Sequence, residues 1–300
     1  MTIRKTAQLT GHHAAVFSLC QGMDAQHFFS AAGDGWVAQW DLENPETGKL
    51  AAKVDAQVFS ICFLKNQQRL VAGDMNGGTH WMDLQHPETT MDIAHHRKGV
   101  FDILSIGEHV FTAGGDGMLT RWAASEGRSL ESFQLANQPL RCLDYCESTH
   151  EIAAGASDGC IYFLNAQTLE LNHVIENAHH HSVFTVKYHP VNRLLLSGGR
   201  DAHLKIWDLE NGWANIYAGP AHWFTINSIV FHPQGLLFAT GSRDKTIKIW
   251  DAQSFELLKV LDTVRDGCHV NSVNKLFWSS HNYTLISCSD DRSIILWEIE

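Results

Sequence analysis

The stretch TGSRDKTIKIWD, Thr240–Asp251, is the clearest copy of a sequence pattern that recurs along the chain. A Ser or Thr opens the pattern, an Asp stands four residues later, and a Trp follows six residues after that Asp. SGGRDAHLKIWD (Ser197–Asp208) lies 43 residues earlier, and SCSDDRSIILWE (Ser287–Glu298) lies 47 residues later. Self-similarity at a fixed period of about 20 to 50 residues indicates a repeat architecture.

Four further copies complete the set. SAAGDGWVAQWD (Ser30–Asp41) and TAGGDGMLTRWA (Thr112–Ala123) keep the layout, whereas AGDMNGGTHWMD (Ala72–Asp83) and AGASDGCIYFLN (Ala154–Asn165) are degenerate. The position of the Trp falls at residues 40, 82, 122, 164, 207, 250 and 297. The sequence therefore predicts a single domain over residues 1–300 that is built from seven units.

A short alternating run precedes each copy, as in SVFTV (Ser182–Val186) and TINSI (Thr225–Ile229). Alternation of apolar and polar residues is typical of a half-buried strand. Turn sequences follow some of these runs, such as His232-Pro233-Gln234-Gly235. Each unit is therefore expected to contain about four short strands, and no segment predicts an amphipathic helix.

This pattern resembles the WD-repeat (WD40) family, and the resemblance covers essentially the whole chain. It is carried by Gly11-His12, Trp40-Asp41, Trp207-Asp208 and Trp250-Asp251, at a period near 42 residues. The resemblance implies an all-β fold, a seven-bladed β-propeller with four antiparallel strands per blade. Family members close the ring with a strand from one end of the chain. We therefore expect Ile3–Leu9 to complete the seventh blade.

The resemblance also implies a hydrogen-bonded set of His, Ser or Thr, Asp and Trp within a blade. The expected sets are His12–Ser30–Asp34–Trp40, His96–Thr112–Asp116–Trp122, His179–Ser197–Asp201–Trp207 and His222–Thr240–Asp244–Trp250, with His95 as the competitor of His96. The other blades depart from the pattern, with Ala72, Asn76 and Met82 in blade two, Ala154 and Leu164 around Asp158 in blade four, and Asp266 at the His position of blade seven. These three blades are expected to depend on apolar packing, which leaves the role of Asp291 open.

Composition narrows the classes of function. Hydrophobic residues make up 44% of the 300 residues, and 22 basic against 33 acidic residues give a net charge of -11. This balance argues against nucleic acid or an anionic membrane as a partner. No apolar run predicts a transmembrane helix, and Met1–Gly11 lacks the apolar region of a signal peptide. The seven cysteines contain no C-x-x-C pair and are expected to be reduced, which favours a cytoplasmic protein.

Three motifs suggest an enzyme, and a structural interpretation suits each of them better. The Ser, His and Asp of the repeat recur at fixed spacing, whereas a catalytic triad occurs once per site. Gly155–Gly159 matches G-x-S-x-G, but a strand-like run follows Ser157 where a nucleophile elbow requires a helix. The run His179-His180-His181 suggests a metal, yet adjacent histidines hold one ion poorly. The sequence thus predicts no catalytic residue, no cofactor and no metal.

Binding residues are expected on the face of the disc that carries the Asp turns. The residue after the conserved Val, Ile or Leu of each unit should point to the mouth of the central channel, which selects Phe17, Phe59, Phe101, Arg141, Phe184, Asn227 and Asn271. Arg200 and Arg243, each directly before a turn Asp, should rim the same channel. The loops of blades five to seven add His180, His181, Trp223, Phe224 and His269.

Several interpretations of this surface stay open. The phenylalanines either pack together and plug the channel, or form a pocket that holds an Arg or a methylated Lys by cation–π contact. The two arginines beside aromatic residues instead favour an acidic or phosphorylated partner segment. The leading hypothesis is a non-catalytic protein-interaction scaffold, monomeric as a free chain and part of a larger assembly. The alternatives are a peptide-reading module and a propeller hydrolase, for which Asp290 is the one candidate channel carboxylate.

Overall fold

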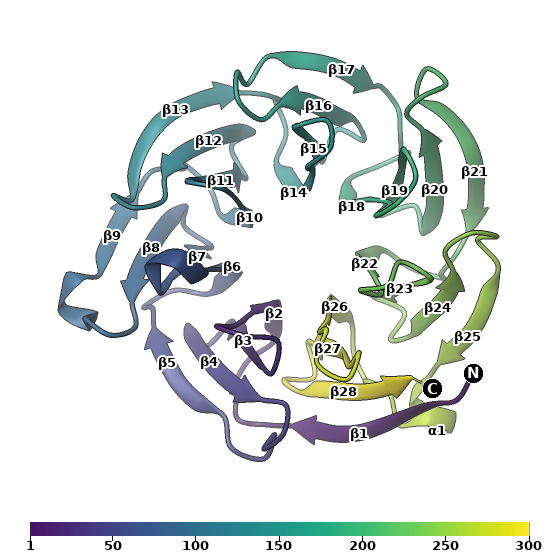
Figure 1. Cartoon of the computed structure of the whole chain (residues 1–300), viewed down its shortest axis with the longest axis horizontal. Coiled ribbons are helices and arrows are strands. Elements are labelled where there is room, and N and C mark those ends of the chain that lie inside the picture. Colours follow the sequence, from purple (N-terminus) through teal and green to yellow (C-terminus); the bar gives the residue numbers. More distant parts are fainter. Residues whose placement is uncertain (300) are drawn as a thin grey trace.

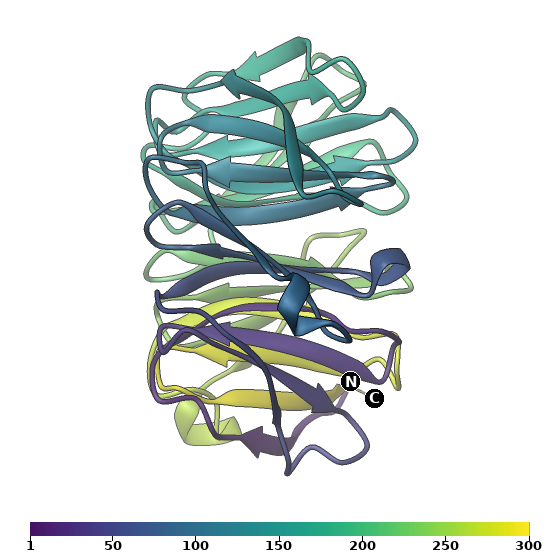
Figure 2. The ribbon, with the colours of Figure 1, turned by 90° about the vertical axis from the view of Figure 1, so that its left-hand side faces the viewer.

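The computed structural model describes residues 1–299, which form seven antiparallel sheets of four strands each. The sheets follow one another around a ring (Figure 1). From the side, the strands run between the two faces of a disc, and connecting loops lie on both faces (Figure 2). The expected seven-bladed propeller with four antiparallel strands per blade is confirmed.

Six blades are each built from four consecutive strands. Blade one contains β2 (Val16–Gln21), β3 (His27–Ala32), β4 (Trp36–Asp41) and β5 (Lys49–Lys53). Blade two contains β6 (Val58–Leu64), β7 (Arg69–Asp74), β8 (Gly78–Asp83) and β9 (Met91–Ala94). Blade three contains β10 (Val100–Ile106), β11 (His109–Gly114), β12 (Met118–Ala123) and β13 (Arg128–Gln134). Blade four contains β14 (Leu140–Cys146), β15 (Glu151–Ala156), β16 (Ile161–Asn165) and β17 (Leu171–Ile175). Blade five contains β18 (Val183–Tyr188), β19 (Leu194–Gly199), β20 (His203–Asp208) and β21 (Ala214–Pro220). Blade six contains β22 (Ile226–Phe231), β23 (Leu237–Ser242), β24 (Ile247–Asp251) and β25 (Leu257–Leu261).

The seventh blade combines both ends of the described chain. It contains β26 (Val273–Trp278), β27 (Leu285–Ser289), β28 (Ile294–Ile299) and the first strand, β1 (Ile3–Leu9). Strand β1 pairs antiparallel with β28, with Ile3 opposite Ile299 and Leu9 opposite Ile294 (Figure 1). The expectation that the N-terminal strand closes the ring is confirmed.

A β-bulge interrupts the innermost strand of every blade, directly after its conserved apolar residue. In β2, for example, the register shifts between Val16 and Ser18, and in β26 it shifts between Val273 and Lys275. A bulge inserts one extra residue and re-aims its side chain. The seven bulge residues are Phe17, Phe59, Phe101, Arg141, Phe184, Asn227 and Asn274.

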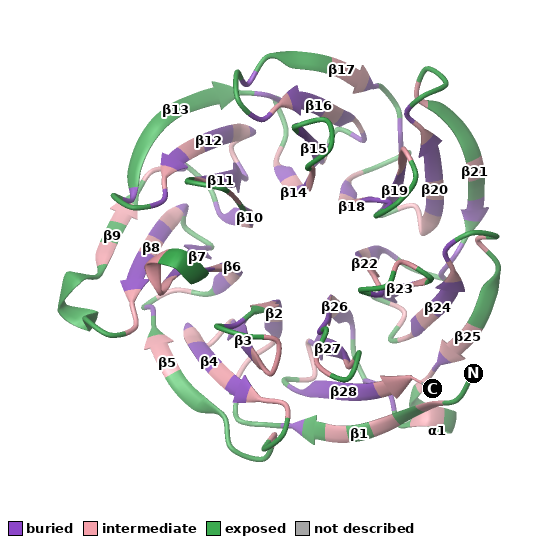
Figure 3. Ribbon diagram, viewed as in Figure 1, coloured by how far each residue is buried: buried purple, intermediate pink, exposed green. Residues whose placement is uncertain are grey.

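Seven apolar clusters fill the spaces between neighbouring blades. The cluster between blades one and seven, for instance, joins Val16 and Phe28 to Ile286 and Leu296. The outermost strands take little part, and every residue of β13 is exposed (Figure 3). The core is therefore a ring of inter-blade layers, which holds the inner strands and their bulges in fixed positions.

One short helical turn and two 3-10 turns interrupt the series of strands. Helix α1 (Thr263–Asp266) lies between blades six and seven, and two 3-10 turns span Lys65–Gln67 and Pro87–Thr89. The Asp262 carboxylate caps α1 by accepting the N–H groups of Val264 and Arg265, and Gly267 ends it with a φ of 65°. This insertion accounts for the longer final step of 47 residues. Over residues 1–299, no helix has the length and apolar character needed to cross a membrane.

Candidate interaction surface

The recurring polar residues form a hydrogen-bonded chain in five blades. In blade six, His222 Nδ1 lies 2.9 Å from Asp244, His222 Nε2 lies 2.8 Å from Thr240, and Trp250 Nε1 lies 2.9 Å from the same Thr240 hydroxyl. Because the carboxylate can only accept, Nδ1–H donates to it and Nε2 accepts from the hydroxyl. The sets predicted for blades one, three, five and six all form, and His96 rather than its neighbour His95 is the member in blade three.

Blade seven has the same chain, so the sequence prediction for this blade was wrong. His269 Nδ1 lies 2.9 Å from Asp291, and both His269 Nε2 and Trp297 Nε1 lie 2.9 Å from the Ser287 hydroxyl. His269 precedes the bulge strand's first residue, Val273, by four positions, as His222 precedes Ile226. The sequence prediction took Val270, rather than Val273, as the conserved apolar residue of blade seven, and it therefore placed the His position three residues too early, at Asp266. That shift also made Asn271 the channel residue, whereas the structure places Asn274 there.

Blades two and four use other polar contacts in addition to apolar packing, which corrects the expectation of packing alone. In blade two, Asp74 accepts the N–H groups of Asn76 and Gly78 and pairs with His80 at 3.0 Å. In blade four, Asp158 accepts the N–H of Cys160 and the hydroxyl of Tyr162. Met82 and Leu164 are buried at the two Trp positions.

Burial and hydrogen bonding shift the pKa values of these groups in a consistent way. Burial lowers the pKa of His12, His96 and His222 below the ordinary value of 6.5, against the opposing pull of their Asp partners. Burial alone would raise the pKa of Asp244, but the hydrogen bonds from His222 and Thr246 hold it well below its usual range. The folded chain therefore contains neutral imidazoles beside ionised carboxylates.

These shifts predict that stability falls as the pH is lowered from about 7 to about 5. In that window the unfolded chain takes up protons on His12, His96 and His222, while the folded chain resists them, so protonation favours unfolding. The free energy of unfolding in urea, measured across the window, should decrease steadily. The variant His222→Gln should show a smaller decrease. A free energy that rises toward lower pH would contradict the buried neutral imidazoles.

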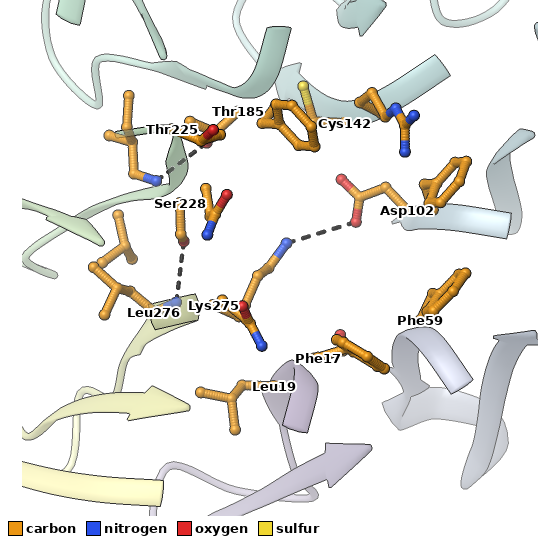
Figure 4. A pocket seen from close by; sticks show the side chains of 18 of the residues that line it. Phe17, Leu19, Phe59, Asp102, Cys142, Thr185, Thr225, Ser228, Lys275 and Leu276 are labelled. Carbon is orange, nitrogen blue, oxygen red and sulfur yellow. Dashed lines mark hydrogen bonds and ion pairs between the residues drawn. The ribbon is translucent and has the colours of Figure 1, made fainter. Parts of the chain in front are cut away.

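The bulge residues surround a cavity of about 620 Å³ at the centre of the ring (Figure 4). Seven of the predicted residues line it: Phe17, Phe59, Phe101, Arg141, Phe184, Asn227 and Arg243. The rings of Phe17 and Phe59 meet edge to face at 5.2 Å, and Phe59 stacks on Phe101 at 5.5 Å. The phenylalanines thus pack on one another, as the plug interpretation expects, but they form a wall and leave the cavity open.

Arg141 continues this aromatic wall. Its guanidinium carbon lies 4.2 Å from the centre of the Phe101 ring and 5.3 Å from that of Phe184, and its Nε donates to Ser157 at 2.7 Å. Burial lowers the pKa of Arg141 from its ordinary value. The cation–π position between these two rings is therefore filled by the protein's own arginine.

One ion pair in the channel joins two residues that were not predicted from the sequence. Lys275 Nζ of blade seven reaches across the cavity to within 3.7 Å of Asp102 of blade three (Figure 4). The other Asp102 oxygen accepts the N–H of Leu143 in the next blade. Asp102 is a second carboxylate of the channel besides Asp290, contrary to the expectation of Asp290 alone. Counting two residues on from the conserved apolar position finds Asp102 after Val100, but it finds Lys275 only once the structure identifies Val273 rather than Val270 as that position.

Among residues 1–299, no three His, Cys, Asp or Glu side chains are grouped so that they could hold a metal ion. Within the same residues all seven cysteines are free, and Cys142, Cys268 and Cys288 are buried.

The remaining predicted residues lie outside the cavity. Arg200, His180 and His181 are exposed and do not line it. His269 is 1% exposed and belongs to the hydrogen-bonded chain of blade seven, so its prediction as a surface binding residue was wrong.

Trp223 and Phe224 are the large apolar side chains of the predicted set that are exposed to solvent. They are 87% and 59% exposed. Their loop is nevertheless tied to the turn of blade six, because Trp223 N–H donates to Asp244, Arg243 N–H donates to the Thr225 carbonyl, and the Ser242 hydroxyl donates to the Phe224 carbonyl. The backbone that carries the two aromatic side chains is therefore tied to the turn that contains Arg243.

Comparisons with known proteins agree with this geometry. A model of the family described as "WD domain, G-beta repeat" matches residues 3–41, 170–208, 214–251 and 257–298, just over half of the chain. WD repeat-containing protein 90 of Xenopus tropicalis is 33% identical over 130 residues, which cover 40% of this chain and 7% of that protein. The p21-activated protein kinase-interacting protein 1-like of Xenopus laevis is 34% identical over 76 residues, which cover 25% of this chain and 20% of that protein.

The matched part is thus a fifth or less of either curated relative. Among solved structures, the WD40 β-propeller domain of Doa1 superposes with a TM-score of 0.86 over 100% of this chain and 97% of that chain, at 18% identity. That likeness concerns the fold. The seven repeats, the hydrogen-bonded chains and the family match together show that the protein belongs to the WD domain, G-beta repeat family.

Proposed function

We propose that this protein is a non-catalytic protein-interaction module that binds a partner on the face bearing the Asp turns. The observation that carries the proposal is the pair Trp223 and Phe224, exposed to 87% and 59% on a loop fixed by hydrogen bonds. Adjacent large apolar side chains exposed to water mark interaction surfaces, and aromatic and Arg residues are typical hot spots. The name of one relative, p21-activated protein kinase-interacting protein 1-like, supports a role in protein binding.

A second candidate is a module that reads a peptide at the channel mouth. The open cavity of about 620 Å³ and its wall of Phe17, Phe59 and Phe101 favour it. Arg141 counts against a partner Arg or methylated Lys, because it already covers Phe101 and adds a like charge. A segment that enters this mouth is better matched if it is apolar or anionic.

The test of the proposed function compares partner capture by variants of the chain. The tagged 300-residue chain is used to isolate partners from a lysate, and a partner identified by mass spectrometry is then purified for binding measurements. We expect Arg200→Ala/Arg243→Ala and Trp223→Ala each to weaken binding by more than about 1 kcal/mol. Both should leave the free energy of unfolding within about 0.5 kcal/mol, because these side chains are exposed.

The matched control is Ile216→Ala, which removes an exposed apolar side chain, 51% exposed, from the outer strand β21 of blade five. It should bind the partner as the unmodified protein does. If the complex survives Trp223→Ala and the double arginine variant unchanged, the partner docks on the rim or on the opposite face, and the proposed surface is wrong.

A further inference from the structure

The residue after each turn Asp, or after Asn76 in blade two, adopts a left-handed backbone in all seven blades. In blades one to four it is a glycine with φ between 78° and 98°, namely Gly35, Gly77, Gly117 and Gly159. In blades five to seven it is Ala202 (φ 62°), Lys245 (φ 74°) and Arg292 (φ 69°). The seven positions are equivalent, because each N–H donates to the carbonyl of the residue three positions earlier.

Glycine suits this position for two reasons. A left-handed backbone is unfavourable for residues that carry a Cβ. In blades one to four, moreover, a Cβ would lie 1.9 to 2.4 Å from a carbonyl oxygen of the following loop. Unlike Asn or Asp, Lys and Arg have no short side chain that eases this conformation. Lys245 and Arg292 therefore stand where four other blades have glycine, and left-handed backbone of this kind at a residue other than glycine clusters at functional sites.

Two further cations directly precede the turn Asp in the sequence of blades five and six. Arg200 and Arg243 directly precede Asp201 and Asp244, whereas the equivalent residues of blades one to four are Gly33, Met75, Gly115 and Ser157. We call Arg200, Arg243, Lys245 and Arg292 the cationic arc. All four are exposed, and within residues 1–299 none of them forms an ion pair.

The acidic residues of these turns do not neutralise the arc at its surface. The side chains of Asp201, Asp244 and Asp291 are 12%, 4% and 8% exposed, and each accepts hydrogen bonds from its buried His and from backbone N–H groups. Asp290 accepts from Asn274 inside the channel mouth. The carboxylates thus face the interior, while the cationic groups face the solvent.

Exposed apolar side chains accompany the cationic arc. Trp223 and Val270, 87% and 63% exposed, occupy equivalent loop positions, since the N–H of each donates to the turn Asp of its own blade. Val264 of α1 is 94% exposed and shares a hollow of about 410 Å³ with Lys245. Arg265 also lines this hollow but is paired with Asp262. Cationic and apolar side chains are therefore both exposed on the loops and turns of blades six and seven.

We propose that the cationic arc binds an acidic segment of a partner protein, and that Trp223 and Val270 pack against apolar residues of the same segment. The proposal rests on the proposed function and specifies the chemistry of its partner. The net charge of -11 makes four unpaired exposed cations on one sector stand out as a complementary surface. The anionic groups are either Asp and Glu carboxylates or phosphates on Ser, and both use the same charge-assisted contacts.

The first test selects short random peptides by display on the full chain. We expect the selected peptides to be rich in Asp and Glu and to contain an aromatic or aliphatic residue. The best peptide is then synthesised with Glu, with phosphoserine or with Gln at the acidic positions. The Gln form should bind at least about tenfold more weakly than the better anionic form. Tighter binding of the phosphoserine form identifies a phosphorylated partner, and tighter binding of the Glu form identifies a carboxylate-bearing one.

The second test separates binding from folding. The variant Lys245→Gly/Arg292→Gly should weaken the best anionic peptide about tenfold. Its melting temperature should be unchanged or raised, because glycine relieves the left-handed backbone at both positions. The control Arg97→Ala/Lys98→Ala removes two exposed cations from the blade-three loop on the same face, where Arg97 N–H donates to Asp116. It should leave peptide binding unchanged.

The proposal is overturned if the selected peptides are neutral or basic, if no peptide is selected, if the Gln form binds equally, or if both double variants weaken binding alike. The last result would indicate a general attraction to positive charge. A captured protein partner that is lost with Trp223→Ala but retained with Lys245→Gly/Arg292→Gly overturns the cationic arc and leaves the proposed function intact. A partner that is retained with both variants overturns both.

Discussion

Deletion of residues 1–10 is expected to cause aggregation or a large loss of stability. Strand β1 covers the outer edge of β28 along six paired positions, and Leu9, 4% exposed, packs in the cluster between blades one and seven. Burial of a Leu side chain alone contributes about 1.5–3 kcal/mol. The deletion also exposes the backbone edge of an apolar strand, which is a template for pairing with another chain.

Point variants can show whether the deletion destabilises the fold because it opens the ring or only because it shortens the chain. Leu9→Ala should lower the free energy of unfolding by about 2–5 kcal/mol, because it leaves a cavity in a packed cluster. Gln8→Ala, on the exposed face of the same strand, should stay within about 0.5 kcal/mol. Urea denaturation measures both, and light scattering follows the deletion variant. A deletion variant that melts as the full chain does would show that β1 does not hold the ring closed.

The sequence predicts the propeller well because its period is so regular. The number of blades follows from the spacing of the Asp and Trp positions, and the closing strand and four of the five hydrogen-bonded chains follow from the family resemblance that this spacing supports. The prediction fails in blade seven, where α1 lengthens the connection and two candidate apolar residues, Val270 and Val273, stand three positions apart. The structure decides between them through the bulge, which begins at Val273.

The channel could be predicted only in part. The bulge residues point to it in every blade, so Phe17, Phe59, Phe101 and Phe184 are placed correctly from the repeat alone. What these residues contact depends on distances across the ring, which spacing does not contain. The contact between Lys275 and Asp102 joins blade seven to blade three, and Arg141 covers two rings from neighbouring blades.

Only half of the cationic arc can be recognised from the sequence. Arg200 and Arg243 are visible in the sequence because they stand before an Asp that the repeat identifies. Lys245 and Arg292 attract attention only once the backbone shows a positive φ at both, where four other blades have glycine. Conformation, rather than residue type, is what makes these two cations unusual.

Asp244→Ala and Asp291→Ala are expected to destabilise the fold by similar amounts, roughly 1–3 kcal/mol each. Each substitution removes the acceptor of a buried His Nδ1–H, of a backbone N–H in the preceding loop and of a neighbouring hydroxyl, from Thr246 or Ser293. Donors left without partners in a buried turn bear the full cost of desolvation.

Asp158→Ala should cost less, under about 1 kcal/mol, because Asp158 is exposed and its donors can turn to water instead. Urea unfolding of the three variants at pH 7, with closely similar denaturant slopes, gives the comparison directly.

The result for Asp291 is the most informative of the three. The sequence left the role of Asp291 open, and only the contact with His269 makes it equivalent to Asp244. Equal losses for Asp158 and Asp244 would show that the hydrogen-bonded chain adds nothing beyond the turn itself. A negligible loss for Asp291 would show that the blade-seven chain is not a stabilising element.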